Sequence, residues 1–233
     1  MLKFVLIVVM LSVGLFGDTK EAYKAFTNKE YKEAFRLYEI SAKDGDLKAQ
    51  NALSYLYFNG LGVDRDAQKG LEWLESAASS SDVSAQYDLG MMYLVGSNIK
   101  TDSNEALKWL SKASDANHTD AQYNLALMYY RGDATDQNVT KAAELLESSA
   151  LGGNEQAEHN VGLVYMQLIK LDKAAHWLEI RAKKGDAKAY YLLAEIYCSQ
   201  EEFKKAKKWA KKSMDSGDEN AKELWIKHNL EKY

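Results

Sequence analysis

Apolar and polar positions recur along this chain at a fixed spacing. An alanine that opens the pattern returns at intervals of 36, 36, 36, 32 and 32 residues. An apolar residue follows it four positions later, and in the first five copies a tyrosine follows eight positions later. These spacings keep one face of a helix apolar. The pattern predicts an array of small helical units that bury their apolar faces by stacking. The alanines are Ala49, Ala85, Ala121, Ala157, Ala189 and Ala221.

Each unit reads as two helices, and residues 82–115 show why. Asp82 can cap a first helix, and Gly96 suits the left-handed residue that ends one. Asp102 or Ser103 can begin a second helix that ends around Asp115. The same reading predicts helix pairs at 18–27 with 29–43, 46–59 with 65–79, 82–95 with 102–115, 118–131 with 139–151, 154–167 with 171–184, and 186–199 with 202–215, then an unpaired helix at 218–231.

The segments AQYDLGMMYLVGS and DSNEALKWLSKAS resemble Sel-one-like repeats, a class of the tetratricopeptide-repeat superfamily. The resemblance is clearest over about residues 46–199, and the flanking units are more similar to ordinary tetratricopeptide repeats. It implies an all-α fold, a right-handed α-solenoid of antiparallel helix pairs with a C-terminal capping helix. It also implies a scaffold or adaptor that binds a protein or peptide partner.

The first residues differ from everything that follows. Lys3 precedes the mostly apolar residues 4–16, and Gly17 and Asp18 come next. A basic start, a short apolar stretch and small residues are typical of a secretory signal peptide. We expect a cleavable signal at 1–17, a solenoid at 18–233, and an exported bacterial protein, periplasmic or secreted. An uncleaved anchor is the alternative, although a spanning helix needs about 20 apolar residues.

Charge, hydropathy and cysteine content limit the kinds of partner that we expect. The formal net charge of the 233 residues is -4, which does not favour binding to nucleic acid. No window after residue 17 is apolar enough to span a membrane, and we expect a monomer. Cys198 is the only cysteine, so an intramolecular disulfide is excluded, and a small buried apolar role is expected for it.

The resemblance also implies where a partner would bind. In tetratricopeptide-like arrays the first helix of each pair lines the concave face. Positions one before the repeating alanine, and two, six, nine and ten after it, would point into that groove. Aromatic side chains there would anchor an extended peptide or a partner helix. The alternative is that these tyrosines pack between neighbouring repeats. The candidate partner-binding residues are Tyr55, Tyr87, Tyr123, Tyr130, Arg131, His159 and Tyr191.

A second charged feature is the run of six lysines between Lys204 and Lys212, on the expected second helix of the last pair. Such a run can contact anionic lipid headgroups or an acidic partner, or it can form a solvated outer face.

Signals for catalysis are poor. The chain has no His or Cys metal spacing, no glycine-rich phosphate loop and no nucleophile elbow, so we expect no metal site, no cofactor and no enzyme activity. Ser97 and Lys100 match the Ser-x-x-Lys pattern of serine β-lactamases, without its companion motifs. The alternative function, implied by resemblance to cysteine-rich secreted Sel-one-like proteins, is penicillin binding or β-lactam hydrolysis.

Overall fold

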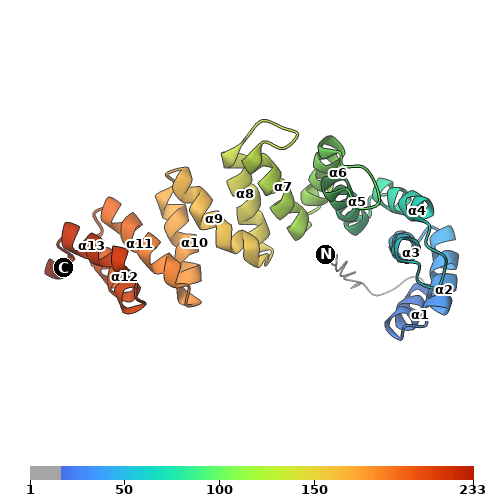
Figure 1. Ribbon diagram of the computed structural model, residues 1–233, viewed down its shortest axis with the longest axis horizontal. Helices are drawn as coiled ribbons and strands as arrows, with labels where there is room; N and C mark the ends of the chain where they lie inside the picture. The colour runs from blue at the N-terminus through green and yellow to red at the C-terminus, as the bar shows by residue number, and fades with distance from the viewer. Residues whose placement is uncertain (1–16) are drawn as a thin grey trace. The chain divides into compact units, whose positions relative to one another are not determined.

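The structure is a computed structural model that describes residues 17–233, and it is helical throughout that range (Figure 1). The paired helices agree with the predicted ranges to within two residues at each end. Their bounds are α1 Gly17–Thr27, α2 Tyr31–Lys43, α3 Leu47–Asn59, α4 Ala67–Ser79, α5 Val83–Val95, α6 Ser103–Asp115, α7 Thr119–Arg131, α8 Val139–Leu151, α9 Glu155–Gln167, α10 Leu171–Lys183, α11 Ala187–Ser199 and α12 Phe203–Asp215, followed by α13 Glu219–Lys227 and a 3-10 turn at Leu230–Lys232.

The chain divides into two compact units, one ending at Leu125 and one covering Ala126–Tyr233. In the first unit, α1 to α6 pack successively on one another, each helix against the next. In the second unit, α8 to α13 do the same. This succession is the packing expected of stacked helix pairs, and the all-α solenoid class is confirmed.

The residue three positions before each repeating alanine caps the start of the helix that contains this alanine. Asp46, Asp82, Asn154 and Asp186 stand there, and their side-chain oxygens accept hydrogen bonds from backbone N–H groups of the first turn. His118 fills the same position, and its Nδ1 accepts from the N–H of Ala121 at 3.3 Å. Each such cap stabilises its helix by about 1 kcal/mol. Because these residue types mark helix starts in the sequence, the predicted starts were accurate.

The glutamine that follows the repeating alanine joins one pair to the pair before it. Gln50 Nε2 donates to the carbonyl oxygen of Ala42 at 3.2 Å, and Gln86 Nε2 donates to that of Ala78 at 3.1 Å. Both carbonyls belong to the last turn of the preceding second helix, where backbone acceptors lack partners within the helix. Each carbonyl also accepts a backbone N–H of the turn after its helix, from Gly45 and Ser81 respectively, so the glutamine adds a second donor that ties the two pairs together.

Neighbouring helices approach closely at small residues. A Cβ atom added to Gly90 of α5 would lie 2.8 Å from Cγ of Leu110 in α6. Trp109, only 7% exposed, fills the space beside this contact in the core around Leu74 and Leu89. Gly90 is therefore a close contact between α5 and α6, and Trp109 is a core residue.

The predicted final helix, 218–231, is wrong at its end. Helix α13 stops at Lys227, because Asn229 takes a left-handed conformation with φ of +48°. The chain then turns, and Leu230 becomes fully buried beside α12. Asn229 is the residue that replaces the repeating tyrosine, and asparagine is among the few residues that adopt this conformation readily.

The predicted signal peptide lies outside the described residues, except for Gly17, which begins α1. Over residues 17–233 no helix is both long and apolar enough to cross a membrane. Cys198 is a buried free thiol, as expected of a small apolar residue.

Replacing Gly90 with alanine tests the close approach of α5 and α6. We expect Gly90→Ala to lower the free energy of unfolding by about 1–3 kcal/mol through overpacking, although alanine favours helix. A Leu110→Ala background removes the two side-chain contacts of the added Cβ and leaves the backbone nitrogen of position 110 at 3.1 Å, so the same change should cost less there. Urea unfolding followed by tryptophan fluorescence measures all four proteins. Equal costs in the two backgrounds would contradict the contact.

Candidate functional site

One face of each first helix carries side chains at three further positions of the repeat, some of them partly buried. Positions two, six and ten after the repeating alanine are four residues apart and lie on one face of the helix. We call this row the first-helix stripe. Its members are Asn51, Tyr55 and Asn59 on α3, Tyr87, Met91 and Val95 on α5, Tyr123, Leu127 and Arg131 on α7, His159, Leu163 and Gln167 on α9, and Tyr191, Glu195 and Ser199 on α11.

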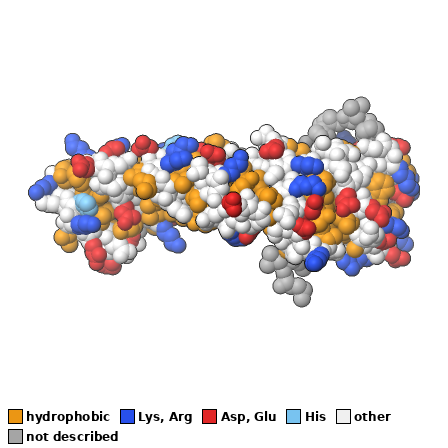
Figure 2. All heavy atoms as spheres, turned by 90° about the horizontal axis from the view of Figure 1, so that it is seen from above, with side chains coloured by type: hydrophobic (Ala, Val, Ile, Leu, Met, Phe, Trp, Pro, Cys, Tyr) orange, Lys and Arg blue, Asp and Glu red, His pale blue; other side chains and the backbone are white. Residues whose placement is uncertain are grey.

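Several apolar side chains on or beside the stripe are exposed. Val95 is 48% exposed and Leu163 41% exposed, and Tyr130, next to the stripe on α7, is 36% exposed. Figure 2 shows exposed hydrophobic side chains interspersed with charged ones of both signs on the face in view. Exposed apolar and aromatic groups of this kind are typical of binding surfaces.

In the first unit the predicted tyrosines are partly engaged in packing. The ring of Tyr55 meets that of Phe26 edge-on with centroids 6.0 Å apart. The ring of Tyr87 stacks on His118 at 4.4 Å, and burial together with nearby carboxylates raises the pKa of Tyr87 to about 12. Tyr123 is half-buried. Part of each surface therefore serves contacts between repeats, as the alternative interpretation expected.

Asp88 lies next to Tyr87, and the sequence analysis did not identify it as a functional residue. Its Oδ2 accepts a hydrogen bond from Nδ2 of buried Asn51 at 3.2 Å, which links α5 to α3. Burial raises the pKa of Asp88 to about 7, against the lowering effect of Asn51 and with a smaller contribution from Asp82. The available signal was a departure from the repeat, because the corresponding residues elsewhere are Ala52, Asn124, Asn160, Leu192 and Leu224.

In the second unit the structure brings several predicted residues together. The Tyr130 hydroxyl donates to Oε1 of Gln167 at 3.0 Å and so joins α7 to α9. Leu163 lies one helical turn from Gln167 and one from His159, on the same face of α9. Arg131, the next residue after Tyr130, is exposed. The result is an apolar side chain bordered by an aromatic ring, an amide and an imidazole.

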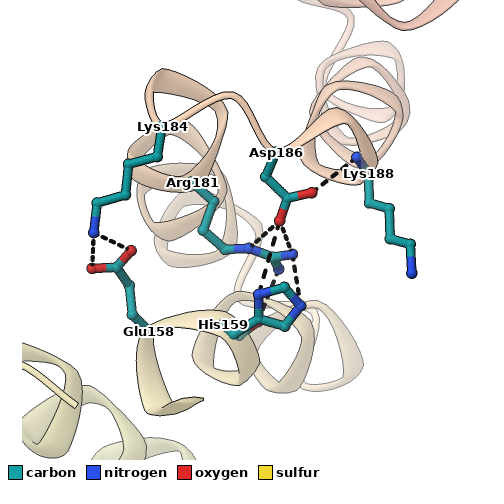
Figure 3. A network of polar contacts seen from close by, with 6 residues as sticks. All are labelled: Glu158, His159, Arg181, Lys184, Asp186 and Lys188. Carbon is teal, nitrogen blue, oxygen red and sulfur yellow. Dashed lines mark hydrogen bonds and ion pairs between the residues drawn. The ribbon is translucent and has the colours of Figure 1, made fainter. Parts of the chain in front are cut away.

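A buried arginine contacts both the backbone and the ring of His159 (Figure 3). Arg181, only 4% exposed, donates through Nη1 to the carbonyl oxygen of His159 at 2.8 Å and through Nη2 to its Nε2 at 3.1 Å. Since a guanidinium only donates, Nε2 is the acceptor in a hydrogen bond between these two groups. Arg181 also donates through Nε to Oδ2 of Asp186 at 2.8 Å and forms an ion pair with it.

The charge of Arg181 acts on its partner. Burial raises the pKa of Asp186, but the hydrogen bonds and charge of Arg181, together with the Lys188 backbone N–H and the nearby His159, lower it overall. Sequence reasoning missed Arg181, although it too breaks the repeat. Eight positions before the repeating alanine, the other copies hold Ser41, Ala77, Ala113, Ser149 and Ser213. An arginine at this small-residue position reaches His159 on the first helix of its own pair and Asp186 at the start of the next pair.

The last candidate, Tyr191, is half-buried on α11. Its hydroxyl donates to Oε1 of Glu195 at 3.3 Å, one turn along the same stripe. Together they give this part of the stripe a polar, anionic character.

The Ser-x-x-Lys match falls in a turn. Ser97 follows Gly96, the left-handed residue that ends α5, so it does not open a helix as the β-lactamase pattern requires. Among residues 17–233 no group of three or more His, Cys, Asp or Glu side chains is placed to hold a metal ion.

Comparison with known proteins defines the class. The family model described as Sel1 repeat matches residues 25–46, 47–82, 83–118 and 119–154, more than half of the chain. The chain therefore belongs to the Sel1 repeat family. The match begins earlier and ends earlier than the resemblance over about 46–199 suggested. It ends where the glutamine after the repeating alanine is lost, since later copies hold Glu158, Tyr190 and Lys222.

Solved structures agree with this assignment. The uropathogenic Escherichia coli protein c5321, described as a protective antigen with an SLR fold, is 25% identical with a TM-score of 0.70. That alignment covers 90% of this chain and 49% of the E. coli chain, so this chain spans about half of that structure. A Sel1 repeat protein from Oxalobacter formigenes is 27% identical with a TM-score of 0.66, over 89% of this chain and 86% of the other. No curated protein sequence gives a significant match.

Removing Arg181 should destabilise the second unit. Arg181→Ala leaves Asp186 without its buried cation, and we expect a loss of about 3–5 kcal/mol in the free energy of unfolding. His159→Ala should cost under about 1 kcal/mol, because its side chain is 56% exposed and its carbonyl remains bonded to Arg181. Urea unfolding monitored by circular dichroism separates the two. Similar costs for both variants would show that the imidazole, rather than the carbonyl and Asp186, is the main partner of Arg181.

Asp88 should make stability depend on pH near neutrality. The unfolded carboxyl loses its proton near pH 4, whereas in the folded protein it keeps that proton until pH about 7. The contribution of Asp88 to stability therefore falls as pH rises from 4 through 7. We expect Asp88→Asn to stabilise the protein relative to the parent more at pH 8 than at pH 5. Thermal unfolding at the two pH values measures this difference. Asp64→Asn, at an exposed loop carboxylate, is the control and should show no such change.

Proposed function

We propose that this chain is an exported scaffold that binds a protein or peptide partner along the first-helix stripe, with no catalytic step. Proteins built from Sel1 repeats are generally interaction scaffolds. The binding surface is proposed from exposed Leu163, which lies between Gln167 and His159 on α9. Tyr130 is hydrogen-bonded to Gln167 beside it. A partner that covers Leu163 removes apolar surface from water, at about 25 cal/mol per Å².

The polar neighbours suit a peptide main chain. The Gln167 amide, whose Oε1 accepts from Tyr130, still has two N–H donors, and Arg131 can pair with a carboxylate or a carbonyl oxygen. An extended segment or a helix with one apolar anchor would place that anchor on Leu163 and its polar groups on this rim. The arrangement follows the usual division of an interface into an apolar centre and a polar edge.

The second unit also limits the entropy lost on binding. Arg181 holds the backbone and the ring of His159, and the Tyr130–Gln167 hydrogen bond restricts both of these side chains. Side chains that are already ordered lose less conformational freedom when a partner arrives. A prearranged surface of this kind favours recognition over general adhesion.

The proposal also covers the cellular location and the oligomeric state of the protein. The basic, then apolar N-terminus supports export to the periplasm or beyond, where a monomer would meet its partner. β-Lactam hydrolysis is the competing function, and a chromogenic cephalosporin assay tests it. Turnover by the full chain that Ser97→Ala abolishes would establish that activity and overturn the scaffold proposal.

A charge placed on the stripe tests the binding surface. Cross-linking in cells, followed by purification and mass spectrometry, would compare the parent with Leu163→Arg. We expect the variant to capture at least about tenfold less of the parent's partner, because a buried apolar contact becomes a desolvated charge.

The matched control is Ile169→Arg. Ile169 is 79% exposed but lies in the turn after α9, outside the stripe, so this variant should retain capture. Loss of capture in both variants would indicate a general effect of charge. The triple variant Tyr55→Ala, Tyr130→Ala, Arg131→Ala examines the sequence-derived residues in the same assay, and unchanged capture by it would remove them from the surface.

A further inference from the structure

Helix α12 carries a cluster of positive charge that lies outside the first-helix stripe. It carries six lysines, and its only acidic residue is Asp215 at its last position. Its inner side, with Ala206, Trp209 and Ala210, is buried, while five of the lysines are exposed. The lysines are Lys204, Lys205, Lys207, Lys208, Lys211 and Lys212.

Aromatic rings, more than carboxylates, surround these ammonium groups. The Nζ of Lys208 lies 4.8 Å from the ring centroid of Trp209, and the Nζ of Lys212 lies 5.5 Å from that of Tyr190. Among the described residues, the ion pair found for this group joins Lys205 to Glu202 at 2.5 Å. A ring contact orients an ammonium without cancelling its charge, so α12 presents a largely uncompensated cationic face.

The exposed lysines form a straight row. Lys204, Lys208 and Lys211 are four and three residues apart and therefore share one face of the helix. At 1.5 Å per residue they span about 10 Å. A flat anionic surface can meet all three at once without bending.

From this arrangement we propose that α12 docks the protein onto an anionic membrane surface. The face contains lysine and no arginine, and lysine is a compact, hydrated charge on a flexible stem, suited to mobile phosphate headgroups. Fixed carboxylates or a nucleic-acid backbone would favour the planar fork of arginine. Ile226, 77% exposed on α13, which packs against α12, offers an apolar side chain near the same helix.

The size of the attraction can be stated. A lysine near an anionic bilayer contributes about 1 kcal/mol, which is roughly fivefold in binding. Three lysines together then account for about a hundredfold preference for anionic over neutral lipid. Salt should weaken it, because the screening length falls from about 10 Å at 0.1 M to about 3 Å at 1 M.

Lysine footprinting on vesicles tests the contact directly. The full chain is mixed with phosphatidylglycerol vesicles or phosphatidylcholine vesicles, briefly acetylated and analysed by mass spectrometry. We expect Lys204, Lys208 and Lys211 to react several-fold more slowly on phosphatidylglycerol alone. Exposed lysines elsewhere in the second unit, at Lys141 and Lys183, should react unchanged. The comparison is residue-specific, so insertion of the apolar residues 4–16 into either bilayer does not obscure it.

A variant in which glutamine replaces three of these lysines measures how much they contribute to binding. Lys204→Gln, Lys208→Gln, Lys211→Gln keeps good helix formers and should lower the ratio of phosphatidylglycerol to phosphatidylcholine binding about a hundredfold. The control Lys141→Gln, Lys183→Gln, Lys188→Gln removes the same charge from α8, α10 and α11. Equal ratios in the two variants, or an α12 footprint that appears with polyglutamate or single-stranded DNA but not with phosphatidylglycerol, would overturn the proposal.

Discussion

The close approach of helices at small buried residues is the constraint on which the rest of this structure depends. All six repeating alanines are fully buried, and Gly90 leaves no room for a Cβ beside Leu110. With the backbones this near, the large residues fill the spaces to either side, as Trp109 does. The outward positions of each helix are less constrained by this packing, although Tyr55 and Tyr87 still contact neighbouring repeats. Those positions make up the first-helix stripe and the lysine face of α12.

The residue after the repeating alanine also makes side-chain contacts, and the chemistry of these contacts changes along the chain. In the early pairs a glutamine reaches back to the end of the preceding second helix, as Gln50 and Gln86 do. In later pairs the same position turns to the second helix that follows. Glu158 pairs with Lys184 at 2.6 Å, and Tyr190 stacks with Trp209 at 5.8 Å. The family signature weakens after residue 154 while the fold continues, and at this position a contact between pairs gives way to a contact within a pair.

Sequence periodicity predicted the fold almost completely, because caps, small contacts and core positions are local and recur. It failed at Asn229, where a single left-handed residue ended the last helix early. The side-chain contacts of the candidate surface were less predictable. Arg181 with His159, and Asn51 with Asp88, join residues from different helices, and their pairing depends on side-chain conformations that no spacing encodes. Even so, Arg181 and Asp88 were visible as departures from the repeat.

Departures from the repeat are where function can arise in such a chain. Residues that match the repeat are accounted for by packing, and a fold shared by many proteins specifies no activity by itself. Packing leaves the outer faces of first and second helices free to change independently. Here the first helices expose apolar and aromatic groups such as Leu163 and Tyr130, while α12 exposes lysines. Because these surfaces lie on different helices of the pairs, a partner on the stripe and an anionic surface on α12 need not compete for the same side chains.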